Sequence, residues 1–558
     1  MKTKSKGIIF FAFVGVIMLA SGITIAIPTA FFDVPESDND ITETSKIISK
    51  AGTGTPLDNI PLEQQDELCG TGYATSNSFV QEYKIPTVCS QPLAITTDPS
   101  GMVWFAQTNG GKLAMFDPVK EEFTEFANPI WDQIFENLSK EFGEKIPARS
   151  MMWGMDYSSD NSIWYTDGDN GALWRFSISD EEYDIIPFPG SVDTKRIFPQ
   201  KLTVDGSILI VNDFLGSKLS FFDFANAQVD QEIRTFAIPS PIEDSYTSDF
   251  AIDSEDNIWY TTWIPRETGI LVKFDYPAYE IQQAISPITQ GLLLQDFVEF
   301  YQFPTGMITP NGITTGPNQK IWIADTTGSF FFSFDPETEE FTKYVTSIPH
   351  ADSYGNLKLP TYSSNPYWIE ESDGNLVMNE HNANRIAVFN SSTESLVEYT
   401  IPSRNPNWAD CEGLDYCGLA QVFGFAIDGK KIWFTEWVEN NIGFVDTSIP
   451  LPFTIDIDSQ NVILERGQTT VITLQFDRLS DLKLPYANTS LNISTTSPFT
   501  DLAITSDYTQ FLTVYGGPES IPIRITASES ALPDTHKVLL GAFNNEIAVS
   551  KFITVTIV

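Results

Sequence analysis

Short runs of alternating hydrophobic and polar positions recur between residues 79 and 447 and predict many short β-strands. Seven of these runs are rich in β-branched and aromatic residues and close on a residue that is polar in every case. They are Val103–Gln107, Ile163–Asp167, Leu209–Asp213, Ile258–Thr262, Ile321–Asp325, Leu376–Glu380 and Ile432–Glu436. In five of the seven units an Asp or Asn stands ten residues after the closing residue, which predicts a second strand ending in a turn.

A second type of run ends in proline and completes each unit. Its seven examples lie at 82–86, 124–129, 185–189, 235–239, 299–304, 343–349 and 398–402. One example precedes the first closing strand and none follows the last one. We therefore expect the N-terminal run to complete the final sheet, because pairing the start of the repeat with its end closes a ring of small sheets. The pattern predicts a seven-bladed β-propeller.

Two insertions and a terminal region depart from the repeat. Residues 130–146 carry apolar side chains near helical spacing, and residues 276–296 form an insertion inside the fourth unit. Residues 450–558 lose the repeat but keep alternating strands such as Thr469–Phe476 and Phe552–Val558. Such a region of short alternating strands predicts an immunoglobulin-like β-sandwich. The predicted fold class is therefore all-β.

The N-terminus has the pattern of a membrane anchor. Lys2, Lys4 and Lys6 precede an uncharged run over residues 7–27, which as a helix would be about 32 Å long and span a bilayer. Basic residues before the run and acidic residues after it predict a single-pass signal-anchor, with the bulk of the chain extracellular. A cleaved signal peptide is the alternative.

These patterns divide the chain into four parts. We expect a cytoplasmic tip and transmembrane helix over 1–32 and a flexible acidic stalk over 33–68. The propeller is expected over 69–449 and the sandwich over 450–558.

Cysteines and glycosylation triplets agree with an exterior location. Four cysteines permit two disulfides, and proximity in sequence favours the pairs Cys69–Cys89 and Cys411–Cys417. Triplets that accept N-linked glycans begin at Asn137, Asn390, Asn488 and Asn492, which predicts a glycoprotein.

Composition excludes several function classes. With 32 Lys and Arg against 74 Asp and Glu, the formal net charge of −42 excludes nucleic acid as a partner. The 42% of hydrophobic residues excludes a disordered acidic chain. Only His350, His381 and His536 are present, so a catalytic histidine cluster is excluded as well.

Several units resemble the repeat of the virginiamycin B lyase (streptogramin lyase) family. The motifs are Asp428–Trp437 followed by Asn441–Gly443, and Asn379–Ile386 in the preceding unit. The resemblance covers about 370 of the 558 residues and implies a seven-bladed propeller that opens a cyclic ester by Mg²⁺-dependent elimination. By motif position the two acids of the family's site correspond to Glu380 and Glu436. The position of the family's histidine is occupied by Phe423, with Asn311 and Tyr367 at the equivalent positions of neighbouring blades.

Repeat equivalence places the seven closing residues on one ring around the propeller axis. Five of them are acidic and, because like charges crowd together there, a hard divalent cation such as Mg²⁺ or Ca²⁺ is expected. The predicted metal ligands are Asp167, Asp213, Asp325, Glu380 and Glu436. The alternative is that these carboxylates only cap strand ends and turns.

The remaining site residues are assigned from the same ring. His381 follows Glu380 and is the candidate general base, so the predicted catalytic set is Glu380, Glu436 and His381, although His381 could instead be an exposed loop residue. The predicted ligand-binding residues are Gln107, Thr262, Trp263, Tyr367, Phe423 and Trp437.

Three functions follow from this sequence. The favoured one is a membrane-anchored extracytoplasmic propeller that binds a small-molecule or cell-envelope ligand, or a divalent metal, on a central acidic face. The alternative is a Mg²⁺-dependent lyase that opens a cyclic ester. The third is a structural protein of the cell envelope.

Overall fold

The computed structural model is nearly all β. It describes residues 47–48, 56–71, 73–187, 197–223, 234–240, 242, 245–264, 267–285, 294–356, 362–414, 417–479, 489–498, 500–511 and 519–558. The predicted transmembrane run at 7–27 lies outside these residues. Among the helices that the structure describes, none combines the length and the apolar character needed to cross a bilayer.

Seven small antiparallel sheets account for the described part of the repeat region, and six of them consist of four strands consecutive in the chain. The first three are β3 (Pro92–Thr97), β4 (Val103–Gln107), β5 (Lys112–Asp117) and β6 (Glu122–Phe126); β7 (Met155–Ser158), β8 (Ser162–Asp167), β9 (Ala172–Ser177) and β10 (Glu182–Pro187); and β11 (Pro199–Asp205), β12 (Ile208–Asp213), β13 (Lys218–Asp223) and β14 (Arg234–Pro239). A two-residue strand, β1 (Ile47–Ile48), adds to the outer edge of β10.

The next three sheets continue in the same way. They are β15 (Phe250–Ile252), β16 (Ile258–Ile264), β17 (Thr268–Phe274) and β18 (Val298–Gln302); β19 (Pro310–Thr315), β20 (Ile321–Asp325), β21 (Phe330–Asp335) and β22 (Glu340–Val345); and β23 (Pro366–Ser372), β24 (Asn375–Glu380), β25 (Arg385–Asn390) and β26 (Ser395–Thr400).

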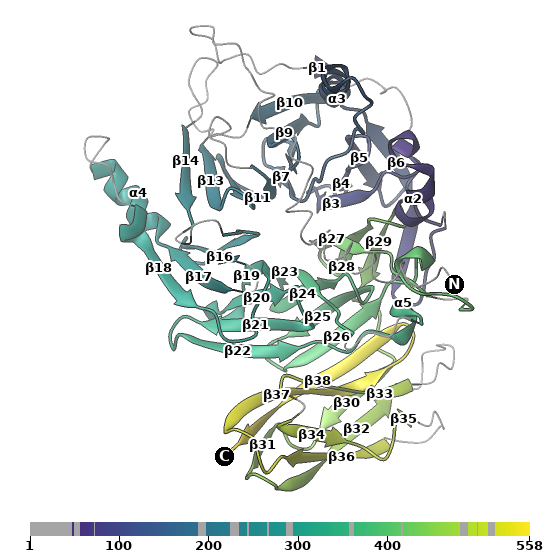
Figure 1. The fold of residues 1–558 in the computed structure, drawn as a ribbon, viewed down its shortest axis with the longest axis vertical. Coiled ribbons are helices and arrows are strands. Elements are labelled where there is room, and N and C mark those ends of the chain that lie inside the picture. The colour runs from purple at the N-terminus through teal and green to yellow at the C-terminus, as the bar shows by residue number, and fades with distance from the viewer. Residues whose placement is uncertain are drawn as a thin grey trace.

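The last sheet joins the two ends of the repeat. It contains β27 (Val422–Asp428), β28 (Lys431–Glu436) and β29 (Asn441–Asp446), and its outer strand is β2 (Val80–Lys84), which pairs antiparallel with β29 over its whole length. The first strand of each sheet is its inner strand, and β27, β3, β7 and β11 follow one another side by side, as do β15, β19, β23 and β27. Figure 1 shows the sheets arranged around a common centre. The predicted pairing of residues 82–86 with the end of the repeat therefore exists in the structure.

The tryptophans of the closing strands pack between sheets. Trp104 stacks on Phe126 and contacts Phe176 of the next sheet, and it is 1% exposed. Its indole donates to Asp98 in the preceding turn, and Trp259 donates to Asp253 in the same way. An aspartate in the turn thus fixes the side chain of a core tryptophan six residues later in the chain, which explains part of the sequence repeat.

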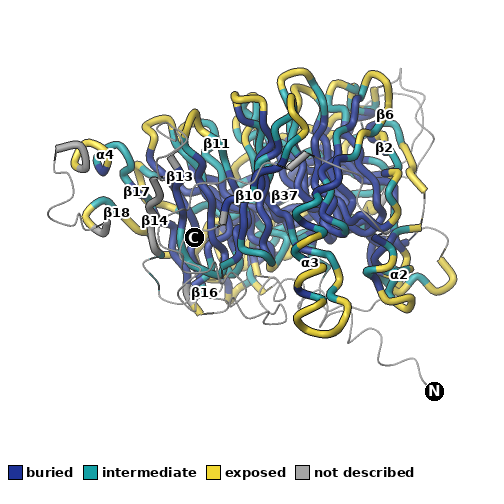
Figure 2. The backbone as a smooth tube through the Cα atoms, turned by 90° about the horizontal axis from the view of Figure 1, so that it is seen from above, coloured by how far each residue is buried: buried dark blue, intermediate teal, exposed yellow. Residues whose placement is uncertain are grey.

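Helical segments interrupt the repeat, and one occurs in each predicted insertion. They are η2 (Pro56–Asn59), α2 (Leu62–Leu68), α3 (Pro129–Phe142), α4 (Tyr276–Ile285), η3 (Leu294–Phe297), η4 (Pro317–Gln319), α5 (Ala351–Tyr354) and η5 (Pro406–Trp408). Asn128 caps α3 by accepting hydrogen bonds from the amides of Ile130 and Trp131, and Gly143 ends it at φ 70°. Figure 2 shows α2 and α3 on the same side of the sheets.

The C-terminal region forms two sheets that share one core. One contains β30 (Phe453–Ile457), β32 (Thr469–Arg478), β34 (Leu502–Thr505) and β36 (Glu519–Ala527). The other contains β31 (Asn461–Leu464), β33 (Thr489–Thr495), β35 (Gln510–Phe511), β37 (Asp534–Phe543) and β38 (Ile547–Ile557). The inward-facing side chains of both sheets belong to the same buried cluster.

The second C-terminal sheet is continuous with the repeat region. β38 pairs antiparallel with β26, so four strands of the sixth small sheet and those of the C-terminal sheet form one nine-stranded sheet. Phe552 packs against Tyr344 and Phe389, and Lys537 contacts Glu394. The C-terminal region is therefore fixed to the sixth small sheet and is not a loosely tethered spacer.

Part of the predicted stalk is folded. Residues 56–71, which we call the N-terminal strap, bury Pro56, Ile60 and Leu68 and so differ from the flexible segment expected up to residue 68. The disulfides Cys69–Cys89 and Cys411–Cys417 are both present, as predicted.

The glycosylation triplets have different environments. Asn137 is exposed on α3, but Asn492 is 5% exposed and donates hydrogen bonds to Ser347 and Ser550. Because a glycan on Asn492 would have to displace these contacts, the prediction is wrong for that triplet in the folded chain. Asn488 lies outside the described residues.

Candidate functional site

The seven closing residues are buried, and each is at most 1% exposed. The side chains of six of them hydrogen-bond within their own sheet or the loops around it, and Glu380 lies beside Arg385. Asp167 accepts from Ser150, Asn170 and the indole of Trp174. Gln107 donates to Glu125, and Thr262 shares hydrogen bonds with Ser240 and Ser245.

Two further acids of the ring bind backbone amides. Asp213 accepts from the amides of Phe198 and Gly216, and Asp325 accepts from those of Ile308, Thr309 and Thr327. Burial raises the pKa of Asp213 to about 6 and also raises that of Asp325. These carboxylates hold the loop at the end of each closing strand, which is the alternative that the sequence left open.

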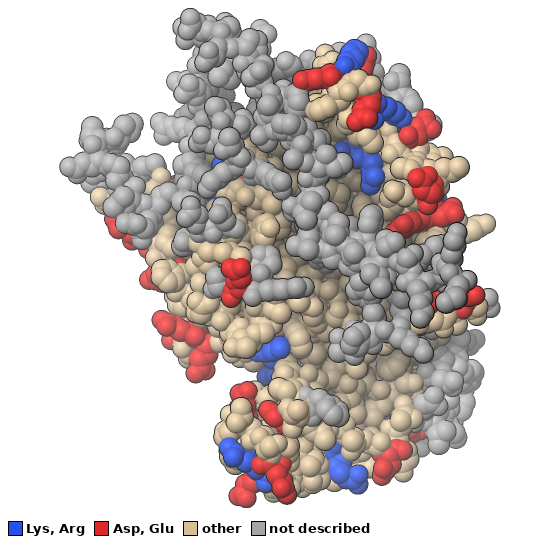
Figure 3. All heavy atoms as spheres, in the orientation of Figure 1, with Lys and Arg blue, Asp and Glu red and all other residues tan. Residues whose placement is uncertain are grey.

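The predicted metal site is not formed by the residues that the structure describes. Within them, no three Asp, Glu, His or Cys side chains come close enough together to hold one cation. On the face seen in Figure 3, the visible described Asp and Glu side chains lie mostly toward the periphery, with Lys and Arg among them. The five acids expected to share Mg²⁺ or Ca²⁺ therefore do not gather around one point, and we derive no chemistry through a metal.

Glu380 belongs to a buried charge network. Arg385 lies 3.7 Å from a Glu380 oxygen and 3.5 Å from a Glu398 oxygen, so one guanidinium serves two carboxylates. Burial, reinforced by the charge of Glu398, raises the pKa of Glu380 to about 8. Near neutral pH Glu380 is therefore mostly a neutral acid.

Glu436 lies beside Glu82 of β2, the outer strand of the last sheet. Asn441 donates to Glu436 at 2.8 Å, and Glu82 accepts from the amides of Thr75 and Ser403 at 2.6 and 3.0 Å. Burial and the adjacent Glu82 raise the pKa of Glu436 well above its usual range. These two buried carboxyls lie side by side where the first strand of the repeat meets the last sheet.

His381, Tyr367, Phe423 and Trp437 do come together, but as a buried aromatic cluster. The His381 ring stacks on Phe423 at 5.0 Å and meets Tyr367 edge-on at 5.7 Å, while Phe423 contacts Trp437 at 6.0 Å. Since His381 is 1% exposed, burial lowers its pKa to about 3 and keeps it neutral. The expectation of an exposed loop histidine is wrong, and so is that of an open pocket lined by these side chains.

Trp263 is also part of the packing. It is 2% exposed and contacts Phe214 and Tyr246. Like Tyr367, Phe423 and Trp437, it fills space where the sequence predicted a ligand.

The N-terminal strap covers part of the same face. Asn109, two residues after Gln107, donates to the carbonyls of Pro56 and Cys89. Trp408 donates to the carbonyl of Glu67 and contacts Trp437 edge-on. The strap and the segment around η5 therefore contribute to the burial of the face that was predicted to bind a ligand.

An open cavity lies further along the central axis. It has a volume of about 530 Å³ and is lined by residues of all seven inner strands or of the residues directly before them. We call it the central channel. The lining residues come mainly from the C-terminal halves of the inner strands, whereas the closing residues pair with the first residues of these strands. The channel therefore extends away from the closing residues. Trp153 and Trp368, which contact each other, lie at the end of the channel nearest to them.

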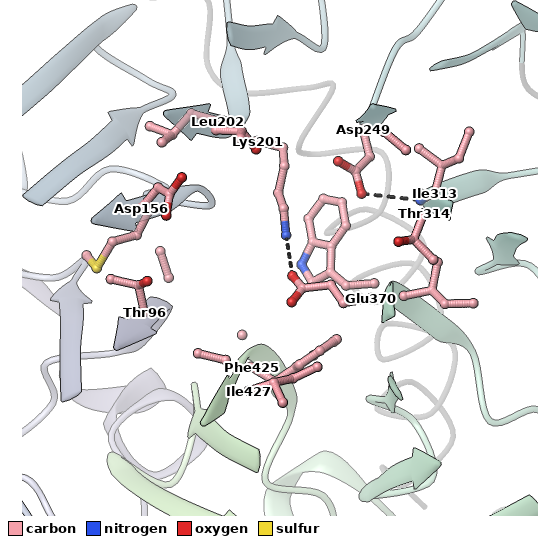
Figure 4. Close-up of a pocket in the computed structure, with 18 of the residues that line it drawn as sticks. Thr96, Asp156, Lys201, Leu202, Asp249, Ile313, Thr314, Glu370, Phe425 and Ile427 are labelled. Atoms are coloured by element: carbon pink, nitrogen blue, oxygen red, sulfur yellow. Dashed lines mark hydrogen bonds and ion pairs between the residues drawn. The ribbon is translucent and has the colours of Figure 1, made fainter. Parts of the chain in front are cut away.

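Glu371 and four other charged residues line the central channel. The Lys201 ammonium lies 3.0 Å from Glu370 and 5.0 Å from the centre of the Trp368 ring. Asp249 accepts from the amides of Phe250 and Ile313. Figure 4 shows Lys201 reaching toward Glu370, with Asp156 and Asp249 on opposite sides of this pair.

The two aspartates of the channel differ in exposure, since Asp249 is buried and Asp156 is partly exposed. Asp249 is 2% exposed, and burial raises its pKa to about 7. Asp156 accepts from the amides of Tyr157 and Val204, and burial raises its pKa to about 6. Each aspartate thus links its own inner strand to the next one around the axis and keeps an oxygen-rich surface near the channel.

The sequence analysis missed all four of these residues. The signal was present one strand earlier than the closing strands. Asp156 and Glu370 stand where the inner strands β3 and β19 carry threonine, and Lys201 stands where those strands carry alanine and glycine. Alternation along a strand sends every second side chain to the same face. Comparing the inner strands with one another, instead of the closing strands, would have identified the channel.

Comparisons with protein families and with curated proteins find no match for this chain. Solved structures with a similar fold do exist. Virginiamycin B lyase from Staphylococcus aureus is 19% identical, with a TM-score of 0.46, and the match covers 66% of this chain and 98% of the lyase. A streptogramin B lyase is 18% identical, with a TM-score of 0.47, over 66% of this chain and 96% of its own.

A third similar structure extends over more of the chain. The extracellular domain of a one-component system from B. thetaiotaomicron is 11% identical, with a TM-score of 0.40, and the match covers 88% of this chain and 60% of that one. The resemblance predicted from the repeats is thus found again among the solved structures, as a lyase-like β-propeller over a segment of the chain. At these identities the likeness concerns the fold alone.

Proposed function

We propose that this chain is a binding protein whose seven small sheets are the blades of one closed β-propeller and whose central channel takes a small polar ligand. The observation that carries the proposal is the channel itself. It is about 530 Å³ in volume, within the range of about 300–1,000 Å³ typical of ligand sites, and five charged residues line it. The proposal moves the ligand site from the closing residues to the inner strands.

The proposal also covers the C-terminal sheets and the N-terminal end of the chain. The two C-terminal sheets with their common core support an immunoglobulin-like sandwich. The two disulfides agree with an oxidising exterior compartment, and the uncharged run at 7–27 would anchor the chain in a membrane.

The lyase alternative has no support in the geometry. Glu380 and Glu436 have no exposed surface, and Phe423 fills the position of the family's histidine. A substrate ester could reach these carboxyls only if the aromatic cluster and the N-terminal strap moved. We therefore do not propose an elimination reaction.

The proposal is tested by filling the channel. Ala251 lines the channel, and Ala251→Trp would occupy much of its volume. The full chain and this variant are screened by thermal melting against a panel of small amines, carboxylic acids and sugars. We expect at least one chemical class to raise the Tm of the natural chain but not that of the variant, because a ligand stabilises only the state that binds it.

The control is a tryptophan introduced outside the channel, at the exposed Val471 of β32. It should leave any ligand response unchanged. If no class acts, or if Ala251→Trp responds as the natural chain does, the channel is not a ligand site.

A further inference from the structure

The charged side chains of the channel occupy two successive layers. Pairing with the closing strands places Asp156 opposite Trp164 and Glu370 opposite Val377, at the same level as Thr96, Thr203 and Thr314. Lys201 and Trp368 stand two residues before Thr203 and Glu370, so they face the channel one layer deeper. Asp249, two residues before the equivalent Ala251, lies in this deeper layer.

The two layers carry more negative than positive charge. Among the described residues that line the channel, Lys201 is the only cation, whereas Asp156, Asp249, Glu370 and Glu371 are acids. Glu370 is paired with Lys201 at 3.0 Å. Asp156 and Asp249 instead accept backbone amides, and the positive charge of Lys201 acts on them only from a greater distance. An anionic ligand would therefore meet net repulsion.

The channel already contains an example of a bound ammonium group. The Nζ atom of Lys201 lies between the Glu370 carboxylate and the face of Trp368, a combination of ion pair and cation–π contact. The adjoining walls are apolar and include Ile313, Phe425 and Ile427. A second ammonium group with an apolar body would find carboxylates on Asp156 and Asp249 and hydrocarbon around them.

We infer that the ligand of the central channel is an organic ammonium ion with an apolar body, whose ammonium group lies beside Asp249 on one side of the Lys201–Glu370 pair. This inference rests on the proposed function and names the chemical class of its ligand. A bare divalent cation is disfavoured because no three acids within the described residues gather closely enough to coordinate it. A neutral polyol would leave the excess negative charge of the channel uncompensated.

The test uses isothermal titration of the full chain with phenethylammonium chloride at pH 8, where Asp249, whose pKa is raised to about 7, is mostly ionised. Its neutral analogue 2-phenylethanol has the same aromatic body without the charge, and MgCl₂ supplies a cation without the body. We expect the ammonium ion to bind at least about tenfold more tightly than the alcohol, since a charge-assisted hydrogen bond contributes more than a neutral one. Tighter binding of the alcohol, or displacement of the ammonium ion by equimolar Mg²⁺, would overturn the inference.

Asp249→Asn keeps an oxygen that can accept the amide of Ile313 but removes the charge. It should weaken phenethylammonium binding by about tenfold. Asp458→Asn is the matched control, because Asp458 also accepts a backbone amide, from Thr473, but lies in the C-terminal sheets. Unchanged affinity in Asp249→Asn, with a melting curve like that of the control, would contradict the assignment.

A third variant keeps the inference testable if Asp249→Asn fails to fold. Lys201→Met removes the resident ammonium and leaves Glu370 and Trp368 free to hold one from solution. We expect methylammonium to raise the Tm of this variant more than that of the natural chain, and an equal response would contradict the inference. If a sugar or carboxylic acid fills the channel instead of an amine, the inference fails while the proposed binding function stands; if nothing binds, both fail.

Discussion

Individual buried carboxyls in this protein stabilise loops and strand ends. Asp167, Asp213 and Asp325 close successive strands and accept hydrogen bonds from the loops around them. A recurring acid at a strand end is therefore explained by local hydrogen bonding before any catalytic role is needed. The pair Glu82 and Glu436 differs because two acids share one buried position, which costs free energy when both are ionised.

Replacing Glu436 by Gln should stabilise the protein. The amide can donate to Glu82 and removes the repulsion between two buried carboxylates, so we expect the free energy of unfolding at pH 8 to rise by about 1 kcal/mol or more. Urea unfolding of the full chain measures this change. The exposed Glu63→Gln is the control and should have no effect, and a loss of stability in Glu436→Gln would show that both carboxyls are needed in charged form.

The sequence could predict where the closing residues stand but not what surrounds them. The repeat located all seven, and the distance between Cys69 and Cys89 in sequence gave the correct disulfide. The burial of His381 could not be predicted, because it depends on Phe423 and Tyr367, which come from other strands. The resemblance to a lyase repeat directed attention to this face, whereas the open cavity lies among the inner strands.

At the scale of elements, contacts distant in sequence close the molecule. The strand β2 completes the sheet of β29, and the Cys69–Cys89 disulfide ties the N-terminal strap to the chain just after β2. The offset between the two types of run along the chain predicted the pairing of β2 with the last sheet. The pairing of β26 with β38 was not predicted. Alternation of side chains along a strand indicates which side chains are buried, but it does not indicate which other strand the edge will pair with.

Removing the strap disulfide should destabilise the protein more than removing the other one. Cys69 and Cys89 are separated by 20 residues and Cys411 and Cys417 by 6, so chain entropy predicts losses of about 3 and about 2 kcal/mol respectively. Thermal melting of the Cys69→Ser/Cys89→Ser and Cys411→Ser/Cys417→Ser double variants measures both. If the Cys69→Ser/Cys89→Ser variant has the same Tm as the natural chain, the disulfide of the N-terminal strap contributes nothing to stability.

At the scale of the whole molecule, raised carboxyl pKa values set the pH dependence of stability. The pKa of Asp249 is raised to about 7 and that of Glu380 to about 8, both mainly by burial. A carboxyl with a raised pKa holds its proton longer in the folded state than in the unfolded state. Tighter binding of this proton in the folded state contributes to the free energy of unfolding. The contribution is complete below the pKa of the unfolded state and is lost as the pH rises through the pKa of the folded state.

We therefore expect the full chain to be more stable at pH 5 than at pH 8. Each such carboxyl contributes about 1.4 kcal/mol per pH unit between its unfolded and folded pKa. The three histidines act in the opposite direction, because burial lowers the pKa of His350 to about 4, that of His381 to about 3 and also that of His536. The carboxyls with a raised pKa outnumber them. Thermal melting across this range should show the Tm falling by several degrees, and Glu380→Gln should flatten the slope. A Tm that rises from pH 5 to pH 8 would show that the buried carboxyls are ionised in the folded chain.

The central claim is that the ligand site is the channel between the inner strands and not the face of the closing residues. A crystal structure of the full chain grown with phenethylammonium chloride tests it most directly. We predict density for the ammonium group beside Asp249, with the aromatic ring against the apolar lining of the channel. Density beside Glu380 and Glu436, with the channel filled only by solvent, would contradict the account.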